Sequence, residues 1–415
     1  MQNSDMRSGE SDNKAHSRRY RLAVVVSHPI QHFVPFYRAL ARNPHIELRV
    51  IYCSSIGLQR YFDAEMNVEL AWEMDLLSGY EHVFLPESGR IKRTDFWSVN
   101  NPSVIRELDK FQPDVVNVYS YAQLTPLRTL LWCRHKRVPT IMWSDSELLH
   151  ARAGWRRALK NVVLRSLYRS ISGFLTVGDN NEAYLNHYGV GRERMFRTPF
   201  TIDEEHFAAV RERREAVRAT ARNALAIPEE AFVALFVGKL VAHKRPRDLL
   251  DAVLSLQTRQ GGRPVYALFA GDGPLMGELR ALAAVARAPC VFAGFVNVDR
   301  LPSIYCTADV LVQPSEKDAH PLVVSEAAFL ALPLIVSDRV GSVGPTDTAR
   351  AGENASIYRC GDVCALARAL QQLAGDSSYY RRMSEASRRI ATELDIQHSV
   401  RGCLEAARAV TARGA

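Results

Sequence analysis

Short apolar runs rich in β-branched residues alternate with segments of helical periodicity along almost the whole chain. This alternation constrains the possible fold more than any other feature of the sequence. In the first half, the runs lie at 21–27, 47–53, 113–120, 138–144 and 173–178. Each run is short and apolar on both faces, which is typical of a parallel strand buried between helices. Strands that alternate with helices indicate βαβ units and a doubly wound sheet.

The alternation restarts after a turn-rich stretch at 197–207. The strands expected in the second half lie at 231–238, 265–271, 290–295, 308–314 and 332–338. The expected helices lie at 208–225, 246–259, 274–287 and 321–331, and 363–413 is helical by periodicity. We therefore predict two Rossmann-like halves of similar size with a hinge near residue 200. Two such domains facing one another form a cleft at the carboxyl ends of their sheets, where ligands bind.

The length of 415 residues agrees with two or three domains. We predict a disordered tail at 1–19, an N-terminal Rossmann-like domain at 20–200, a C-terminal Rossmann-like domain at 201–385, and a C-terminal helix at 386–415 that packs back toward the first domain. The first 19 residues are polar, so we do not expect a secretory signal there. No apolar run approaches the roughly 18 to 20 residues that span a bilayer.

The formal net charge of +8 favours an anionic partner, which could be a nucleic acid, a membrane surface or a phosphorylated substrate. No zinc-finger or RNA-binding signature accompanies this charge, so we expect no nucleic-acid partner. The seven cysteines form no CxxC pair, which disfavours a zinc site and indicates reduced thiols. A cytoplasmic location is therefore expected.

Two expected strand ends carry groups suited to a phosphorylated ligand. Gly238 ends one strand, and Lys239 and Lys244 follow it in the loop before a helix. Glycine lets the backbone approach a ligand closely, and lysines beside a helix N-terminus can bind a diphosphate. The segment FAGDGPL at 269–275 ends the next strand with two glycines, Gly271 first. The alternative interpretations are a solvent-facing basic loop and an ordinary tight turn.

A third group follows in QPSEKDAHPLVVSEA, at 313–327. Asp318 would lie just before a helix that begins near Pro321, and Glu326 would lie in its second turn. A carboxylate in such a place can bind ribose hydroxyls. The amides that would point toward the cleft and hold an anionic phosphate belong to Leu322, Val323 and Val324. The alternative is that both carboxylates are surface charges.

The order of these motifs resembles retaining glycosyltransferases of family 4, which have the GT-B fold. The matching segments are GKL-x3-K, AGDGP, GF, ADVLVQPS, and an acidic residue followed eight positions later by Glu-Ala. The resemblance covers essentially the whole second half, through residue 370. It implies an α/β protein with two facing Rossmann-like domains and a cleft between them. It also implies a nucleoside-diphosphate sugar as the donor substrate, and no cofactor.

The resemblance assigns roles to individual residues. The implied catalytic residues are Lys239 and Lys244, which would neutralise the donor diphosphate, and Asp318, which would lie near the donor sugar hydroxyls. The implied donor-binding residues are Gly238, Gly271, Phe295, His320, Leu322, Val323 and Glu326. Among them, Glu326 would bind the ribose and Phe295 would begin the pocket for the base. The chain departs from the family pattern at Lys239, where Arg is usual, at Asp318, where Glu is usual, and at Pro321, which is often Gly.

The first half carries the acceptor-side candidates. A histidine-proline-isoleucine-glutamine (HPIQ) segment contains His28 and Gln31, and WEMDLLSGY follows at 72–80; together they resemble a subgroup of the family. His28 and Gln31 follow a strand end and could contact the donor or the acceptor. Asp145 and Glu147 follow a later strand and could orient the acceptor. The alternatives are a structural histidine and carboxylates that cap a loop.

The segment 151–173 is rich in arginine and lysine and contains no acidic residue. Its apolar residues Trp155, Leu159, Val163 and Leu167 recur at helical spacing. A helix of this kind can rest on the anionic inner leaflet of a membrane as a peripheral contact. It can equally be an amphipathic helix that packs on the sheet. Membrane contact would suit a lipid-linked acceptor, although the sequence does not identify the acceptor.

We therefore predict a retaining glycosyltransferase that moves a sugar from a nucleoside-diphosphate sugar to an acceptor hydroxyl. Envelope polysaccharide, glycolipid or related glycoconjugate synthesis is the expected setting. No DxD metal motif is evident, so no metal is expected. Two alternatives remain open. One is a nucleotide-sugar epimerase on the same scaffold, and the other is a non-catalytic subunit that binds nucleotide sugars.

Overall fold

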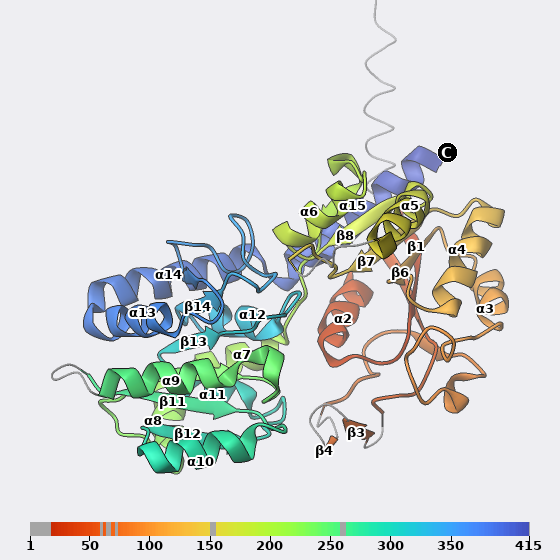
Figure 1. The fold of residues 1–415 in the computed structure, drawn as a ribbon. Coiled ribbons are helices and arrows are strands. Elements are labelled where there is room, and N and C mark those ends of the chain that lie inside the picture. Colours follow the sequence, from red (N-terminus) through yellow and green to blue (C-terminus); the bar gives the residue numbers. More distant parts are fainter. Residues whose placement is uncertain are drawn as a thin grey trace, which may run out of the picture.

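The computed structural model describes residues 18–58, 61–63, 68–70, 74–149, 155–257 and 263–414. Two α/β domains stand side by side, the first drawn mainly in red to yellow and the second in green to blue (Figure 1). Each contains a parallel sheet with helices on both faces, which confirms the two predicted Rossmann-like halves. The predicted tail lies outside the described residues except for Arg18 and Arg19.

Within the described residues, the first sheet has seven parallel strands in the order β5-β2-β1-β6-β7-β8-β9. Their bounds are β1 Tyr20–Val26, β2 Ile46–Tyr52, β5 His82–Phe84, β6 Val115–Tyr119, β7 Thr140–Ser144, β8 Gly173–Thr176 and β9 Met195–Arg197. Five of these strands coincide with the apolar runs of the first half. The two edge strands, β5 and β9, have three residues each, too few for a periodic pattern.

The second sheet has six described strands, also parallel, in the order β12-β11-β10-β13-β14-β15. Their bounds are β10 Phe232–Val237, β11 Val265–Ala270, β12 Cys290–Gly294, β13 Val310–Gln313, β14 Leu334–Ser337 and β15 Ala355–Tyr358. The first five were expected from the sequence, whereas β15 was not. A short antiparallel pair, β3 Tyr61–Asp63 and β4 Val68–Leu70, belongs to neither sheet.

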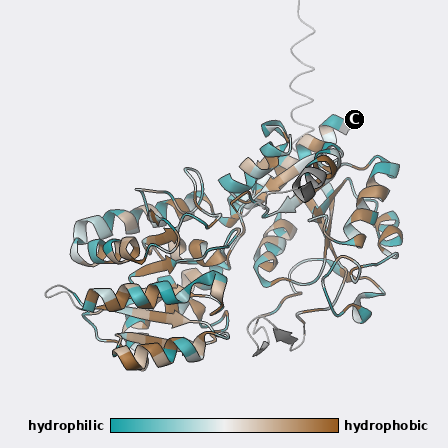
Figure 2. Ribbon diagram, viewed as in Figure 1, coloured by the Kyte–Doolittle hydropathy of each residue, from teal (hydrophilic) through white to brown (hydrophobic). Residues whose placement is uncertain are grey.

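The helices bury both faces of each sheet because the central strands are apolar on both sides. β10 is buried along its whole length, as expected for a parallel strand between two helical layers. Figure 2 shows brown, hydrophobic strands inside each domain and teal, hydrophilic helix surfaces outside. Burial of this apolar surface is the main force that stabilises such a domain.

In the first domain, α2 Val34–Arg42 and α15 Ile396–Gly414 pack on one face of the sheet. The helices on the other face are α3 Val104–Phe111, α4 Leu124–Lys136, α5 Trp155–Arg169 and α6 Asp179–His187. Short 3₁₀ turns precede some of these elements: η1 Gln31–Phe33, η2 Ser88–Arg90 and η3 Arg192–Arg194.

In the second domain, one face of the sheet is covered by α7 Glu204–Arg211, α8 Arg214–Ala224, α11 Leu301–Thr307 and α12 Leu322–Phe329. The other is covered by α9 Pro246–Gln257, α10 Met276–Ala286, α13 Val363–Gly375 and α14 Ser377–Glu393, with η4 Ala242–Lys244 before α9. The prediction of one helix at 208–225 is wrong. Asp203 caps the start of α7 by accepting from the His206 amide. α7 ends at Arg211, the chain turns, and Arg222 near the end of α8 donates to the Asp309 carboxylate.

The last helix, α15, returns to the first domain. Its side chains Val400, Cys403, Ala407 and Val410 join the core that α2 forms on the first sheet. The chain therefore crosses between the domains twice, once after β9 and once before α15 (Figure 1). The predicted domain boundaries remain predictions. None of the helices in the described part of the chain combines the length and the apolar composition needed to cross a membrane.

A second contact between the domains lies at the start of α6. The Asp179 carboxylate accepts from the Thr346 amide at 2.8 Å, and the Asp179 amide donates to the Asp347 carboxylate at 2.9 Å. The Asn180 side chain donates to the Val343 carbonyl at 2.8 Å. We call these contacts between α6 and residues 341–347 the domain seam. Together with α15, the seam joins the two domains.

Candidate functional site

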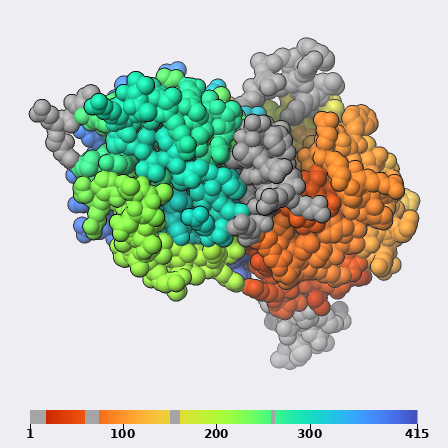
Figure 3. Space-filling view, turned by 90° about the horizontal axis from the view of Figure 1, so that it is seen from below, coloured from red at the N-terminus to blue at the C-terminus, as the bar shows by residue number. Residues whose placement is uncertain are grey.

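A cavity of about 650 Å³ lies between the two domains, at the carboxyl ends of the strands. Figure 3 shows the domains from below, the second in green and cyan beside the first in red and orange. Eight of the predicted site residues line this interdomain cavity. They are Gln31 from the first domain and Gly238, Lys239, Gly271, Phe295, Leu322, Val323 and Glu326 from the second.

Two strand ends approach each other closely in the second-domain wall. Gly238 follows β10 with φ 142°, and Gly271 follows β11 with φ 153°. A Cβ atom on Gly271 would lie 1.9 Å from the Gly238 carbonyl oxygen. Only glycine fits at residue 271, because any side chain would collide with this backbone. The two glycines thus let the backbone of both loops come together and form the part of the cavity wall beside Lys239.

The start of α12 forms the next part of the wall. Pro321 is the N-cap residue, and Leu322 and Val323 are the first two residues of the helix. Their amides lie at the positive end of the helix dipole, which favours an anion. The expectation of a third free amide is wrong, because the Val324 amide donates to the Pro321 carbonyl at 3.2 Å.

Glu326 stands in the second turn of α12 and lines the cavity. The Tyr305 hydroxyl, from α11, donates to its carboxylate at 2.5 Å. Burial raises the pKa of Glu326 to about 7, although the hydrogen bond from Tyr305 acts in the opposite direction. The carboxylate therefore changes its charge near neutral pH, in a position from which it can accept hydrogen bonds from a ligand in the cavity.

Lys244 and Asp318, two of the implied catalytic residues, form an ion pair. The Lys244 Nζ atom lies 2.5 Å from Asp318 Oδ2, and the Gln313 side chain donates to the same oxygen at 2.7 Å. Both charged side chains are mostly buried. Neither lines the interdomain cavity, whereas the third implied catalytic residue, Lys239, does.

His320, implied to bind the donor, lies at the domain seam. Its imidazole is almost fully buried, and its Nε2 atom lies 3.1 Å from the Asp347 carboxylate. Asp347 also accepts from the Asp179 amide of the first domain. His320 does not line the cavity, so a donor-binding role remains a prediction for this residue.

The acceptor-side candidates occupy different positions. Gln31 lines the cavity. His28 shares a hydrogen bond of 2.8 Å with the Ser27 hydroxyl, and burial lowers its pKa to about 4, so it is neutral.

The other two acceptor-side candidates follow β7. Burial raises the pKa of Asp145, on which His320 and Asp318 of the second domain act electrostatically. Asp145 therefore faces the second domain. The Glu147 carboxylate accepts from the nearby Leu149 amide, which is a loop-capping contact.

The two segments of the subgroup resemblance meet in space. Arg38, on α2 just after the HPIQ segment, donates to the carbonyls of Ser78 at 3.0 Å and Asp75 at 2.7 Å. The rings of Tyr37 and Tyr80 are 5.4 Å apart. Residues 72 and 73 lie outside the described residues. The described part of WEMDLLSGY thus supports α2, whose N-terminal end borders the cavity.

Within the basic segment at 151–173, the structure shows α5 over Trp155–Arg169, but its inward face differs from the expected stripe. Leu164 and Tyr168 are buried in the core of the first domain, whereas Val163 is 55% exposed. Leu167 packs partly against the same core. The side chains of Trp155 and Leu159 lie outside the described residues. The residues that pack on the sheet, Leu164 and Tyr168, therefore lie one position after the predicted Val163 and Leu167.

Several cavity residues escaped the sequence analysis. His32 stands directly after Gln31, and Thr201, Asp203 and His206 come from the hinge and α7. His32 could have been predicted from the sequence, because it directly follows the HPIQ segment. The hinge residues reach the cavity only through the pairing of the two domains, which no local pattern reveals.

The geometry of His32 is unusual. Its ring centroid lies 4.3 Å from that of Phe33 and 5.1 Å from that of Phe200. Burial, with a smaller contribution from His28, lowers the pKa of His32 to about 4. Within the described residues, its Nε2 atom is buried and has no hydrogen-bond partner. This neutral imidazole thus leaves a buried nitrogen unsatisfied beside the cavity, which costs free energy.

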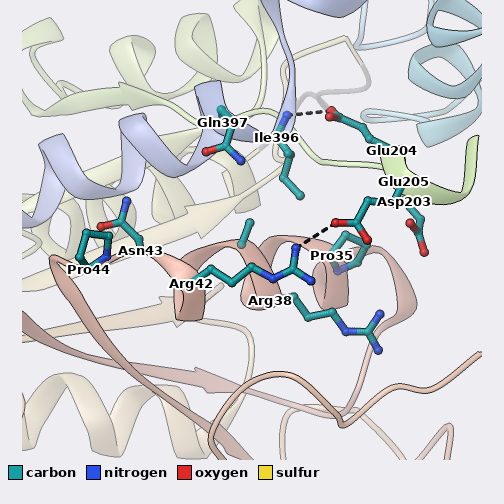
Figure 4. Close-up of a pocket in the computed structure, with 11 residues that line it drawn as sticks. Pro35, Arg38, Arg42, Asn43, Pro44, Asp203, Glu204, Glu205, Ile396 and Gln397 are labelled. Atoms are coloured by element: carbon teal, nitrogen blue, oxygen red, sulfur yellow. Dashed lines mark hydrogen bonds and ion pairs between the residues drawn. The ribbon is translucent and has the colours of Figure 1, made fainter. Parts of the chain in front are cut away.

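A second pocket, of about 440 Å³, adjoins the interdomain cavity at the hinge and shares Pro35 and Asp203 with it. Figure 4 shows Arg42 of α2 opposite the start of α7. Arg42 pairs with Glu205 at 2.9 Å, and the Glu204 carboxylate accepts from the Ile396 amide at 2.7 Å. These groups satisfy one another across the hinge, so the pocket is a junction between α2, α7 and α15.

Among the residues that the structure describes, no group of three or more His, Cys, Asp or Glu side chains could hold a metal ion. Independence from metal remains a prediction.

Two parallel-sheet domains that enclose a cavity at the ends of their strands have the GT-B architecture, and comparison with solved structures confirms this fold class. Anabaena HepE, in complex with UDP and glucose, superimposes with a TM-score of 0.66 over 93% of this chain and 99% of that one, at 14% identity. A glycosyltransferase from Rickettsia africae superimposes with a TM-score of 0.68 over 94% and 98%, also at 14% identity. At this level of identity, the likeness concerns the fold alone.

The sequence comparisons concern mainly the second half. Residues 217–390 match the family described as Glycosyl transferases group 1. The D-inositol 3-phosphate glycosyltransferase of Nocardia farcinica is 30% identical over 227 residues, which are 52% of this chain and 48% of that protein. The sulfoquinovosyl transferase of Arabidopsis thaliana is 26% identical over 287 residues, 63% and 50% of the two chains. The matched regions span about half the length of these relatives.

Proposed function

We propose that this protein is a retaining glycosyltransferase of family 4, in the subgroup with an HPIQ segment, that transfers a sugar from a nucleoside-diphosphate sugar to an acceptor hydroxyl. One observation carries the proposal. The second-domain wall of the interdomain cavity brings together Lys239, the start of α12, Glu326 and Phe295. The first two suit the diphosphate of a nucleotide donor, Glu326 suits its ribose and Phe295 suits its base, and the same domain matches the group 1 glycosyl transferases.

The wall offers each part of the donor a suitable partner. Lys239 and the amides of Leu322 and Val323 favour the negative diphosphate. Glu326, when ionised, can accept hydrogen bonds from both ribose hydroxyls. The side chain of Phe295 is 37% exposed beside the cavity and offers an apolar surface to the base.

Charge stabilisation would supply the catalysis. As the bond between the anomeric carbon and the diphosphate oxygen breaks, negative charge grows on the leaving group. Lys239 and Lys244 would stabilise that charge. Lys244 is held in place by Asp318, whose carboxylate can also orient a sugar hydroxyl. The departing phosphate would take the proton of the acceptor hydroxyl as the new bond forms on the same face of the sugar, which retains the anomeric configuration.

The first domain would supply the acceptor side. Gln31 lines the cavity, and Asp145 faces the second domain from the end of β7. Closure of the domains around both substrates would exclude water and limit hydrolysis of the donor. A lipid-linked acceptor at the cytoplasmic face of a membrane, in polysaccharide or glycolipid synthesis, is part of the proposal. On α5, the exposed Val162 and Val163 beside Arg165 make this helix one candidate for membrane contact.

The first test is a thermal-shift screen with UDP-, GDP-, ADP- and dTDP-sugars, because a selective ligand stabilises the folded state. The preferred donor then serves in a turnover assay with Lys244→Ala, which should lose about 100-fold in turnover. Lys317→Ala is the matched control, since Lys317 lies in the same loop as Asp318 but is exposed. Equal turnover in both variants would remove Lys244 from the mechanism.

Product analysis separates the alternatives. Transfer with the same anomeric configuration in donor and product, measured by NMR, is the expected result. A sugar that returns epimerised on its nucleotide would indicate the epimerase. Donor binding without turnover, with every acceptor tried, would favour the non-catalytic subunit. Absence of any thermal shift would contradict the donor site itself.

A further inference from the structure

The most exposed aromatic side chain in the described part of the chain is not among those that line the interdomain cavity and lies in the segment between β5 and α3. Trp97 is 75% exposed, and its neighbour Phe96 is 36% exposed. The segment leaves the core at Ile91 and returns to it at Val99, both of which are buried in the first domain. We call residues 92–98 the aromatic tip.

Hydrogen bonds hold the aromatic tip in one conformation. The Asp95 carboxylate accepts from the amides of Trp97 at 3.2 Å and Ser98 at 3.0 Å. The Gln123 side chain donates to the Thr94 carbonyl at 2.7 Å, and the Leu124 amide donates to the Phe96 carbonyl at 3.2 Å. The indole is therefore kept at the surface by a tied backbone, where exposure of so large an apolar group is costly unless something covers it.

The charge around the aromatic tip is positive. Arg90, Lys92 and Arg93 are exposed on the approach to the two rings. Among the described residues, two acidic groups of this segment are already engaged. Asp95 is bonded within the tip and pairs with Arg93 at 3.2 Å, and Glu87 accepts from the Ser103 hydroxyl at 2.5 Å. Arg90 and Lys92 thus remain to attract an anionic surface.

The aromatic tip lies at the end of the first sheet that is formed by the carboxyl ends of the strands. It follows β5, and it is bonded to the start of α4, which follows β6. Gln31 follows β1 and Asp145 follows β7. All these segments leave the carboxyl ends of parallel strands, so they share one edge of the sheet.

We propose that the aromatic tip is a membrane-docking surface that inserts Trp97 and Phe96 among the headgroups of an anionic bilayer. Tryptophan is enriched at the level of the headgroups, because its ring is apolar and its N–H is polar. Lysine and arginine beside it are attracted to anionic lipids. This surface goes beyond the proposed reaction and does not depend on it. Docking would turn the acceptor-side edge of the sheet toward the membrane.

Among the α5 side chains that the structure describes, the exposed apolar ones are the valines Val162 and Val163. They lack the polar group that favours the interface, which Trp97 of the aromatic tip has. The two surfaces belong to different elements, so they can be altered separately.

The test is co-sedimentation of the full chain with vesicles of phosphatidylglycerol and phosphatidylcholine, and with vesicles of phosphatidylcholine alone. We expect binding to the anionic vesicles that weakens as salt is added. Trp97→Ser should weaken it about tenfold, and Lys92→Ala about fivefold. Val285→Ser is the matched control, because Val285 on α10 of the second domain is 86% exposed. It should bind like the unaltered chain.

A second measurement follows the side chain directly. Trp97 fluorescence should shift to shorter wavelength with anionic vesicles, and Trp97→Phe should abolish that shift while largely preserving binding. The proposal is overturned if the unaltered chain does not bind anionic vesicles, or if Trp97→Ser and Lys92→Ala bind as tightly as the control. It is also overturned if only Val162→Ser and Val163→Ser weaken binding, or if light scattering shows that Trp97 instead joins two copies of the chain.

Discussion

At the scale of single residues, His32 and Glu326 stand on opposite walls of the interdomain cavity, and each is in an unusual state for a different reason. His32 has a buried nitrogen without a hydrogen-bond partner among the described residues. Glu326 has a partner, Tyr305, but burial still raises its pKa to about 7. Both states cost free energy.

Replacement of His32 tests the first state. In His32→Phe, we expect the free energy of unfolding to stay equal or to rise by up to about 1 kcal/mol, because an apolar ring removes an unsatisfied group. Turnover should fall about fivefold or more if the nitrogen binds a substrate. Urea unfolding and a turnover assay measure the two effects. A clear loss of stability would mean that the imidazole has a structural partner.

Glu326 predicts a pH dependence. With a pKa of about 7, the carboxylate is ionised at pH 8 and mostly protonated at pH 6. Affinity for a nucleotide sugar, whose diphosphate does not titrate in this range, should fall about tenfold from pH 8 to pH 6. Calorimetric titration measures it. Glu326→Gln should bind the nucleotide sugar weakly at both pH 8 and pH 6. If the affinity of this variant depends on pH as strongly as that of the unaltered chain, the titrating group is not Glu326.

The same shift has a consequence for stability. A carboxyl group whose pKa is higher in the folded state stabilises the protein while protonated in both states, and that contribution is lost as pH rises from the unfolded value toward 7. Glu326 therefore favours folding less at pH 8 than at pH 5.

The site residues that the sequence located share one property: each lies within a few positions of a strand end or helix start. Gly238, Gly271 and Leu322 are of this kind, and parallel strands bring such positions to one edge. His320 also fits the pattern but points into the domain seam. Which side of a loop a side chain takes depends on the other domain, and that information is absent from local periodicity.

At the scale of elements, the close approach of the loops after β10 and β11 makes a sharp prediction. Gly271→Ala would place a Cβ atom 1.9 Å from the Gly238 carbonyl oxygen at a φ of 153°. We expect a loss of about 2–4 kcal/mol in the free energy of unfolding, measured with urea. Gly277→Ala is the control, since nothing lies within 4 Å of its Cβ position on α10. That variant should be up to about 1 kcal/mol more stable.

Element prediction succeeded where strands are long and apolar and failed where a tertiary contact decides. β9 and β15 are short edge strands, of three and four residues. α7 ends at Arg211 and α8 begins at Arg214, and Arg222 of α8 donates to the Asp309 carboxylate and to the carbonyl of Thr307, the last residue of α11. These contacts join residues some 85 positions apart, so the continuous helical periodicity at 208–225 could not reveal the turn.

At the scale of the whole molecule, the domain seam and α15 together hold the cavity in shape. Asp179 is the central residue of the seam, with hydrogen bonds to Thr346 and Arg197. Burial alone would raise the pKa of Asp179, but these bonds hold it below its usual value. Ionised Asp179 therefore stabilises the folded protein fully above the pKa that it has in the unfolded chain. This contribution to the free energy of unfolding is lost as pH falls through the lower pKa of Asp179 in the folded state.

Asp179→Ala should loosen the seam without unfolding either domain, because each sheet keeps its own core. We expect a larger radius of gyration in X-ray scattering and two resolved thermal transitions in place of one. Asp362→Ala is the matched control. Asp362 also accepts a backbone amide, at the start of α13, but the bond lies within the second domain. It should cost about 1 kcal/mol and leave the radius unchanged. If Asp179→Ala also keeps its radius, α15 alone sets the domain arrangement, and the seam contributes only local stability.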